Sequence, residues 1–403
     1  MAVVLIGTLD TKGLELGFVR DILRARGIET LVIDAGSLDG PRAAADIDRG
    51  RVFRAAGTSV EELRSIGDRG TAVTAAARGA AIVVKELHDA GRVDAVFGLG
   101  GGAGTTIGAS AMRALPFGVP KVMVSTLASG QTRPFIAGSD IFLLYSVADI
   151  AGLNRLTRAV LSNAAHAVAG MVSARADAPV EDDRLLIAAT MFGVTTPCVD
   201  RARERLEAAG CEVLVFHATG AGGQAMEGLV RDGKFAAVLD LTTTELADEL
   251  VGGILSAGPD RLEAAGRAGV PQVVSVGALD MVNFGPRHTV PERFAGRRFH
   301  AHNENVTLMR TTPAECAAIG AKMAEILGRS RGPVVMILPL GGVSGLDVPG
   351  QPFHDPEADQ ALFDALRAGL ANHPNVKLIE RPEAINDPAF ADAAAEALLA
   401  LIG

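Results

Sequence analysis

Residues 94–108 read DAVFGLGGGAGTTIG. A short apolar run at 93–97 leads into five glycines among the seven residues 98–104, and an alanine-rich helical pattern begins after Thr105 and Thr106. A strand, a glycine-rich turn and a helix N-terminus in this order are typical of an anion-binding site. Glycines let the backbone approach a ligand, and the helix offers free amides and the positive end of its dipole. The stretch predicts a phosphate site, and the alternative is a tight turn whose glycines only relieve crowding.

The sequence of this stretch is similar to the patterns of two better-known phosphate-binding loops. Gly98, Gly100 and Ala103 match the dinucleotide pattern G-x-G-x-x-A, but the next apolar run, 121–124, ends in Ser125 and Thr126 where that pattern needs a carboxylate. Gly104 stands where a P-loop has its lysine. We therefore expect a phosphate held by backbone amides and threonine hydroxyls.

The composition limits the classes of partner. The chain has 403 residues, 48% of them hydrophobic, and a net charge of −9, which argues against nucleic acid or an anionic membrane as the main partner. Its three cysteines are scattered, so neither a disulfide framework nor a cysteine zinc site is indicated. The first residues, MAVVLIGTLD, have the pattern of a strand, and no apolar run reaches membrane-spanning length. We expect a cytoplasmic protein.

Apolar runs alternate with helical patterns along most of the chain. Runs at 2–6, 30–33, 93–97 and 121–124 are separated by helical segments and short turns, which predicts an α/β fold with a doubly wound, mainly parallel sheet. Residues 37–70 and 281–305 are polar and without period, so we expect irregular excursions there. A helical pattern with little charge at 149–174 indicates a homo-oligomer, most simply a twofold dimer.

The second half of the sequence resembles the first. LVFHATGAGG at 214–223 matches LVIDAGSLDG at 31–40, and QVVSVGALD at 272–280 matches KVMVSTLASG at 121–130, with two further matches in the same order. We therefore expect an internal duplication, with two Rossmann-like domains at 1–178 and 184–403 joined by RADAPVEDD at 175–183. Ligands would then bind in a cleft between the halves.

The loop GTLDTKG at 7–13 follows the first predicted strand. Asp10 is a candidate ligand for nucleotide-bound Mg²⁺, and Lys12 a candidate phosphate contact; the alternative is a helix-capping aspartate and a solvated lysine. Together with the glycine loop and the loop after residue 124, this gives a nucleotide-binding set. Its members are Gly7, Thr8, Asp10, Thr11, Lys12, Gly100, Gly101, Gly102, Gly104, Thr105, Thr106, Ser125, Ser129 and Gly130.

The loops of the second half carry hydroxyls and a histidine in place of dense glycine. The catalytic candidates are Thr196, Cys198 in a predicted first helical turn, and His217 as an acid or base; a packing role is the alternative for the cysteine. A small anionic metabolite is the expected ligand, with arginines as countercharge. The substrate-binding candidates are Thr195, Gly220, Gly222, Gly223, Thr243, Thr244, Arg287 and Arg298.

Several motifs resemble one known family. They are GTLDTKG, GLGGGAGTT, VSTLASG, YSVADIAGLNR, TMFGVTTPC, FHATGAGG, DLTTTELADEL, GALDMVNFGP and FHDPEAD, and the resemblance covers essentially the whole chain. The family is a largely uncharacterised one of bacteria and fungi that also forms the N-terminal part of the tomato resistance protein against tomato mosaic virus. It implies an ATP-binding region of two Rossmann-like subdomains, without an established reaction, and the antiviral role is not transferred.

Two hypotheses about function follow. In the first, the protein is a cytoplasmic metabolic enzyme that binds ATP or ADP with Mg²⁺ and acts on a small anionic metabolite. In the second, it is a nucleotide-sensing or partner-binding protein without turnover.

Overall fold

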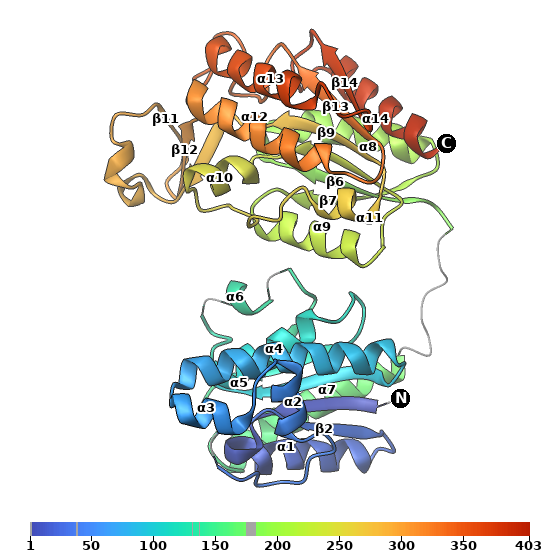
Figure 1. Cartoon of the computed structure of the whole chain (residues 1–403), viewed down its shortest axis with the longest axis vertical. Coiled ribbons are helices and arrows are strands. Elements are labelled where there is room, and N and C mark those ends of the chain that lie inside the picture. Colours follow the sequence, from blue (N-terminus) through green and yellow to red (C-terminus); the bar gives the residue numbers. More distant parts are fainter. Residues whose placement is uncertain (1, 38, 131, 137, 175–182) are drawn as a thin grey trace. The chain divides into compact units, whose positions relative to one another are not determined.

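The computed structural model describes residues 2–37, 39–130, 132–136, 138–174 and 183–403. The chain divides into two compact units, Met1–Glu181 (unit 1) and Asp182–Gly403 (unit 2). Figure 1 shows both as layered α/β structures, with helices on the two faces of each main sheet. In the described parts of the chain, no helix is both long and apolar enough to cross a membrane.

Unit 1 is built on a parallel five-stranded sheet with the order β2-β1-β3-β4-β5. The strands are β1 (Ala2–Gly7), β2 (Thr30–Asp34), β3 (Val93–Gly100), β4 (Lys121–Ser125) and β5 (Phe142–Tyr145). All six residues of β1 are buried, because helices cover both faces of the sheet, and this explains its continuous apolar sequence.

The helices of unit 1 form two layers (Figure 1). The strand residues Val3, Leu5 and Phe97 pack on the layer of α1 (Leu9–Arg24) and α7 (Arg155–Ala174). Alternate residues, such as Val4 and Ile6, pack on the opposite layer of α2, α4 and α5. The remaining helices of unit 1 are α2 (Arg49–Ala55), α3 (Val60–Ile66), α4 (Arg69–Asp89), α5 (Gly102–Arg113) and α6 (Arg133–Ile136).

The prediction of an irregular excursion at 37–70 is wrong in part. The short helices α2 and α3 lie in this segment, and the side chains of Asp48 and Ser59 accept hydrogen bonds from the amides of their first turns. These caps were visible in the sequence, but each helix has only seven residues, too few for a clear apolar period.

Unit 2 repeats this topology and extends it. Its six-stranded parallel sheet has the order β14-β13-β9-β8-β6-β7. The first five strands of this sheet along the chain, β6, β7, β8, β9 and β13, therefore have the arrangement of the five strands of unit 1. The strands are β6 (Leu186–Met191), β7 (Glu212–His217), β8 (Ala237–Thr242), β9 (Gln272–Gly277), β13 (Val334–Pro339) and β14 (Val376–Arg381). The shared strand order supports the predicted duplication.

Helices also cover both faces of the sheet of unit 2. One face packs on α8 (Thr196–Ala208) and α14 (Pro388–Ile402). The other packs on α9 (Ala221–Arg231), α11 (Ala264–Ala268), α12 (Pro313–Gly328) and α13 (Pro356–Leu370), with α10 (Glu245–Val251) beside α12.

The expected irregular segment at 281–305 is also corrected. It contains β10 (Met281–Phe284) and β11 (Phe299–Asn303), which pair with β12 (Val306–Arg310) in a three-stranded antiparallel sheet. Short 3₁₀ turns at Arg287–Thr289 and Glu292–Phe294 connect the first two strands. β11 and β12 form a local hairpin, in which Asn303 pairs with Val306. β10 pairs with β12 between residues far apart in sequence, such as Met281 and Arg310, which a local pattern does not show.

Candidate functional site

The candidate site of unit 1 lies at the carboxyl edge of its sheet. The strand order changes direction between β1 and β3, and the loops after these two strands border a small cavity of about 50 Å³. Such a switch point is where open α/β sheets bind ligands. Thr8 lines the cavity from the end of β1, Asp10 and Thr11 from the first turn of α1, and Ala103 from the first turn of α5. Ser37 and Arg69 complete its polar lining.

The N-terminus of α5 has no cap from its own chain within the described residues. Gly101 is the N-cap residue and has no side chain to accept from the first amides, and the first backbone bond made inside the helix is from Thr105 N to Gly101 O, at 2.8 Å. Gly102, the first helical residue, is exposed. A twelve-residue helix therefore presents its free amides beside the cavity.

The glycines of this loop have two different roles. A Cβ on Gly104 would lie 2.8 Å from Leu99 O, and one on Gly98 would lie 2.8 Å from Met123 Sδ, so these two relieve crowding. Gly100 has a φ of 155° and would also place a Cβ 2.8 Å from Gly104 Cα. A Cβ on Gly102 would meet nothing within 4 Å. Crowding does not explain the glycine at position 102.

The hydroxyls after β3 and β4 are only partly available. Thr105 Oγ1 and Ser125 Oγ share a hydrogen bond of 2.7 Å and are both buried. Thr106 Oγ1 donates to Gly102 O at 2.9 Å. Ser129 and Gly130 lie in the turn after β4 and do not line this cavity. Because these hydroxyls already have partners, the amides at the start of α5 are the main groups of the predicted nucleotide-binding set that could contact a ligand.

Asp10 is buried beside a cation. Arg49 Nη1 lies 3.9 Å from Asp10 Oδ2, and its Nε donates to Asp34 Oδ2 at 2.7 Å. Asp34 also accepts from the amide of Leu9, so Asp34 and not Asp10 caps α1. Among the residues that the structure describes, no group of three or more histidine, cysteine or acidic side chains is placed to hold a metal ion. Mg²⁺ at Asp10 would need phosphate oxygens as further ligands.

Lys12 is engaged away from this cavity. Its Nζ donates to the carbonyl oxygen of Ile150, in the segment that leads to α7, and Lys12 does not line the cavity. In this structure Lys12 joins α1 to the neighbouring loop, which differs from the predicted phosphate contact.

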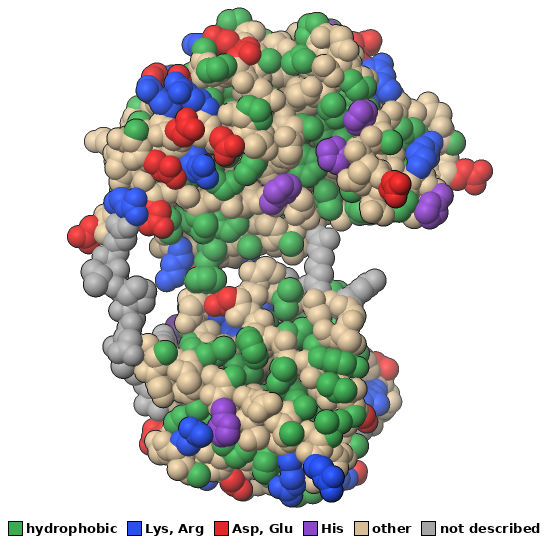
Figure 2. Space-filling view, turned by 180° about the vertical axis from the view of Figure 1, so that it is seen from behind, with side chains coloured by type: hydrophobic (Ala, Val, Ile, Leu, Met, Phe, Trp, Pro, Cys, Tyr) green, Lys and Arg blue, Asp and Glu red, His purple; other side chains and the backbone are tan. Residues whose placement is uncertain are grey.

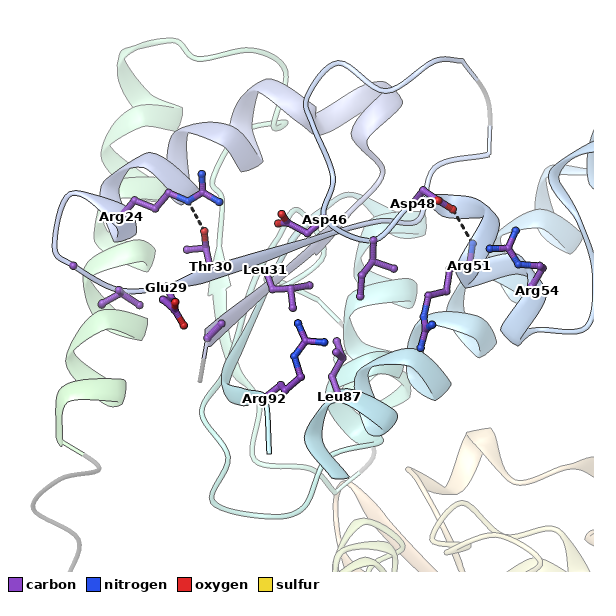
Figure 3. A pocket seen from close by; sticks show the side chains of 14 residues that line it. Arg24, Glu29, Thr30, Leu31, Asp46, Asp48, Arg51, Arg54, Leu87 and Arg92 are labelled. Carbon is purple, nitrogen blue, oxygen red and sulfur yellow. Dashed lines mark hydrogen bonds between the residues drawn. The ribbon is translucent and has the colours of Figure 1, made fainter. Parts of the chain in front are cut away.

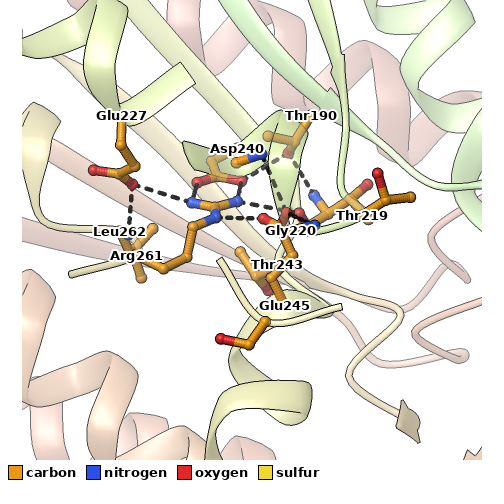
Figure 4. A network of polar contacts seen from close by, with 12 residues as sticks. Thr190, Thr219, Gly220, Glu227, Asp240, Thr243, Glu245, Arg261 and Leu262 are labelled. Carbon is orange, nitrogen blue, oxygen red and sulfur yellow. Dashed lines mark hydrogen bonds and ion pairs between the residues drawn. The ribbon is translucent and has the colours of Figure 1, made fainter. Parts of the chain in front are cut away.

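In unit 2 the N-terminus of α9, the helix after the second strand of the sheet, is occupied by the protein itself. Glu245 Oε1 accepts from the amides of Gly220, at 2.6 Å, and Gly223, at 3.1 Å, at the N-terminus of α9 (Figure 4). A Cβ on Gly223 would lie 2.1 Å from Glu245 Oε2. Where the sequence predicted an anionic substrate at Gly220, Gly222 and Gly223, the carboxylate of Glu245 thus takes the amides of Gly220 and Gly223.

A fully buried arginine balances this carboxylate. Arg261 Nε donates to Glu245 Oε2 at 2.7 Å, and its terminal nitrogens bind both oxygens of Asp240 (Figure 4). Glu227 lies 3.4 Å from Arg261 Nη1 and accepts from two backbone amides. Burial opposes the charge of Arg261, yet the three carboxylates raise its pKa well above its usual value. Burial raises the pKa of Glu227.

The other candidates in unit 2 are mostly buried. Thr195, Thr243 and Thr244 are fully buried; Thr195 bonds to Thr242, at 2.8 Å, and Thr243 donates to Ser275 O. Burial raises the pKa of the Cys198 thiol to about 12, the reverse of what a nucleophile needs. The structure therefore favours the packing role that was the alternative for this cysteine.

Thr196 and His217 are more accessible. Thr196 Oγ1 donates to Met191 Sδ and Phe192 O. His217 is exposed at the end of β7, with its ring edge-on to Phe192 at 5.7 Å between centroids. Neither contact gives a proton relay.

The two arginines expected as countercharge have partners near the antiparallel sheet. The guanidinium of Arg287 lies 3.9 Å from the centroid of the Phe299 ring. Arg298 pairs with Asp355 at 3.6 Å and donates to His354 O.

Sequence reasoning missed Ser37, Arg49 and Arg69, which line or adjoin the cavity of unit 1. All three lie in or next to the segment 37–70 that was expected to be irregular. The only available signal was its position after the second strand, whose loop lies at the same edge of the sheet.

The fold and the site define a two-unit α/β protein with doubly wound parallel sheets, in which α5 begins at the switch point of unit 1 with an exposed glycine and a first turn that is uncapped within the described residues. The chain belongs to the uncharacterised protein family UPF0261, whose N-terminal domain matches residues 1–177 and whose C-terminal domain matches residues 184–402.

Relatives align over nearly the whole chain. A UPF0261 protein of Clostridium tetani is 49% identical over 98% of this chain and 98% of its own length. The ToMV resistance protein Tm-1 of Solanum lycopersicum is 42% identical over 98% of this chain, which covers 55% of the tomato protein.

The similarity to solved structures is low. A putative UDP-N-acetylglucosamine 2-epimerase of Listeria monocytogenes has 12% identity and a TM-score of 0.23, covering 100% of this chain and 96% of that one. Similarity this low carries no argument about ligands.

Proposed function

We propose that this protein binds a nucleotide, ATP or ADP, through phosphate contacts at the N-terminus of α5 in unit 1. One observation carries the proposal: the first turn of α5 is uncapped within the described residues and begins at an exposed glycine beside a polar cavity. Free amides and the helix dipole favour a phosphate at this position. The family resemblance independently implies ATP.

The residues around the cavity suit a phosphorylated ligand. Thr8, Thr11 and Ser37 supply hydroxyls, and Arg69 supplies a guanidinium. A guanidinium and hydroxyl donors complement phosphate oxygens, and Asp10 stays the predicted Mg²⁺ ligand.

The comparison between the two units favours unit 1 as the binding half. In unit 2 the helix at the equivalent position is α10, which begins at the fully buried residues Thr244 and Glu245, whereas α5 of unit 1 begins at the exposed Gly102. The second, anionic substrate predicted for unit 2 is not part of this proposal. A cytoplasmic location and a homo-oligomeric state stay predictions.

The test is the substitution Gly102→Val. A Cβ at this position meets no neighbour, so the fold should persist, but the side chain would cover the amides of α5. We expect calorimetry to show binding of ATP or ADP to the parent protein and at least about a hundredfold loss in the variant, because charge-assisted hydrogen bonds to phosphate contribute about 1.5–3 kcal/mol each.

Gly193→Val is the matched control. Gly193 is also exposed, is the first residue of a short 3₁₀ helix in unit 2, and would meet nothing within 4 Å as a larger residue. It should leave affinity unchanged. Equal affinity in the Gly102 and Gly193 variants would reject the α5 site.

A further inference from the structure

Unit 1 has a second hollow at the opposite edge of its sheet. A groove of about 850 Å³ lies where β1 and β2 begin and where α1 and α4 end (Figure 3). Ala2, Thr30 and Leu31 line it from the strands, and Leu87 and Arg92 from the end of α4 and the turn after it. Its volume is within the range of small-molecule sites.

Four arginines border this groove. Arg24, Arg51, Arg54 and Arg92 are all exposed and come from three different elements or turns. Figure 3 shows Arg92 rising toward Leu31, and Arg24 reaching toward Thr30, to which its Nε donates at 2.8 Å. The guanidinium groups of Arg54 and Arg92 make no hydrogen bond or ion pair with any residue in the described ranges.

The acidic residues of the wall are already engaged. Asp48 accepts from the amide of Arg51 as the cap of α2, at 2.9 Å. Asp46 Oδ2 accepts from the amide of Val32 at 2.8 Å. Glu29 has a polar partner as well. These carboxylates therefore bind other groups of the protein and do not pair with Arg54 or Arg92. The terminal nitrogens of these two arginines face solvent.

Four apolar side chains also line the groove, those of Ile28, Leu31, Ile47 and Leu87. A guanidinium matches a phosphate with two parallel hydrogen bonds, and apolar side chains accept the body of a small organic molecule.

We propose that this groove is a second anion site for a phosphorylated small metabolite, with Arg54 and Arg92 as the cations available to its anionic groups. Arg24 adds positive charge from the other side of β2, and the apolar side chains of the groove contact the rest of the ligand. The site is separate from the proposed nucleotide site, because β1 places the two at opposite ends of six residues, about 20 Å apart. It does not depend on the proposed function.

The test measures the binding of inorganic pyrophosphate to the full chain by calorimetry. Arg92→Gln keeps a polar side chain of similar length, and Arg92 is exposed with no described partner, so the fold should be unaffected. We expect at least about tenfold weaker binding in Arg92→Gln and a further loss in the double variant with Arg54→Gln. Lysine at both positions should restore affinity only in part, because it keeps charge but not the planar fork.

Two controls test whether pyrophosphate binds in this groove and not elsewhere on the chain. Arg203→Gln with Arg329→Gln removes the same charge from a half-buried and an exposed position in unit 2 and should leave binding within about twofold. The Arg92→Gln substitution is also measured in a Gly102→Val background, in which α5 no longer contributes to pyrophosphate binding, and the weakening should persist there. Equal weakening by the unit 2 pair, no weakening by Arg92→Gln in the Gly102→Val background, or no binding by the parent protein at millimolar pyrophosphate would each overturn the proposal.

Discussion

Glu245 shows at the scale of one residue how the chain itself occupies a helix N-terminus in unit 2. Its carboxylate accepts from two amides of α9 and from Arg261, so it satisfies a helix terminus and a buried cation together. Its partners lie 16 to 25 positions away in sequence. No local motif indicates them, which is why the loop FHATGAGG was predicted to be open to a ligand.

We expect Glu245→Ala to destabilise the protein by about 3–5 kcal/mol, because it leaves two buried amides and part of a buried guanidinium without an acceptor. Urea unfolding followed by circular dichroism measures this. Glu380→Ala removes a carboxylate from an exposed pair with Arg367 and should cost less than about 1 kcal/mol. Similar costs for the two variants would contradict the structural role of Glu245.

A second buried cluster predicts a pH dependence of stability. Arg310 pairs with Asp359 at 2.7 Å and with Asp347 at 3.4 Å. Burial raises the pKa of Asp359 to about 7, with Asp347 beside it adding to the shift, and burial also raises the pKa values of Asp280 and Asp347. The folded state thus holds protons that the unfolded state, with carboxyl pKa values near 4, has released.

The sign of the effect follows from this proton balance. The protonated carboxyls of these aspartates stabilise the folded state relative to the unfolded one. This contribution to the free energy of unfolding is fully present below about pH 4 and is lost as the pH rises through about 7. We therefore expect the urea midpoint to fall between pH 5 and pH 8, and Asp359→Asn to flatten the fall. A midpoint that rises over this range in the parent protein and is unchanged in slope by the substitution would contradict the assignment.

At the scale of elements, the loop from β3 to α5 contains both kinds of glycine that its sequence allows: glycines that relieve crowding and a glycine that crowding does not explain. Gly98, Gly100 and Gly104 relieve crowding, and Gly102 faces open space. The glycine-rich pattern predicted the strand, the turn and the helix, but it could not separate these two roles, because they depend on Leu99, Met123 and the path of the backbone.

Alanine substitutions test this division. Gly104→Ala brings a methyl group within 2.8 Å of Leu99 O, so we expect a loss of stability of about 1–3 kcal/mol. Gly102→Ala meets no neighbour and should change stability by less than about 1 kcal/mol. Thermal unfolding compares the two. An equal loss for both variants would mean that position 102 is also required for the turn.

At the scale of the whole molecule, the strand order 2-1-3-4-5 occurs in both units, as the matching segments of the sequence predicted. The sequence also indicated that residues near 175–183 separate the halves; residues 175–182 lie outside the described ones. What the pattern could not indicate is that the amides at the start of α9 bind a carboxylate of the chain. That depends on Glu245 and Arg261, which meet only in the folded unit.

Because every loop of the proposed nucleotide site belongs to unit 1, this unit should bind without unit 2. Unit 1 has its own sheet and hydrophobic cores on both faces. We expect a fragment of residues 1–181 to bind ATP or ADP within about threefold of the full chain, and Gly102→Val to abolish binding in the fragment as well. Calorimetry measures both, and circular dichroism checks that the fragment is folded. A folded fragment that fails to bind, beside a full chain that binds, would mean that residues of unit 2 complete the site.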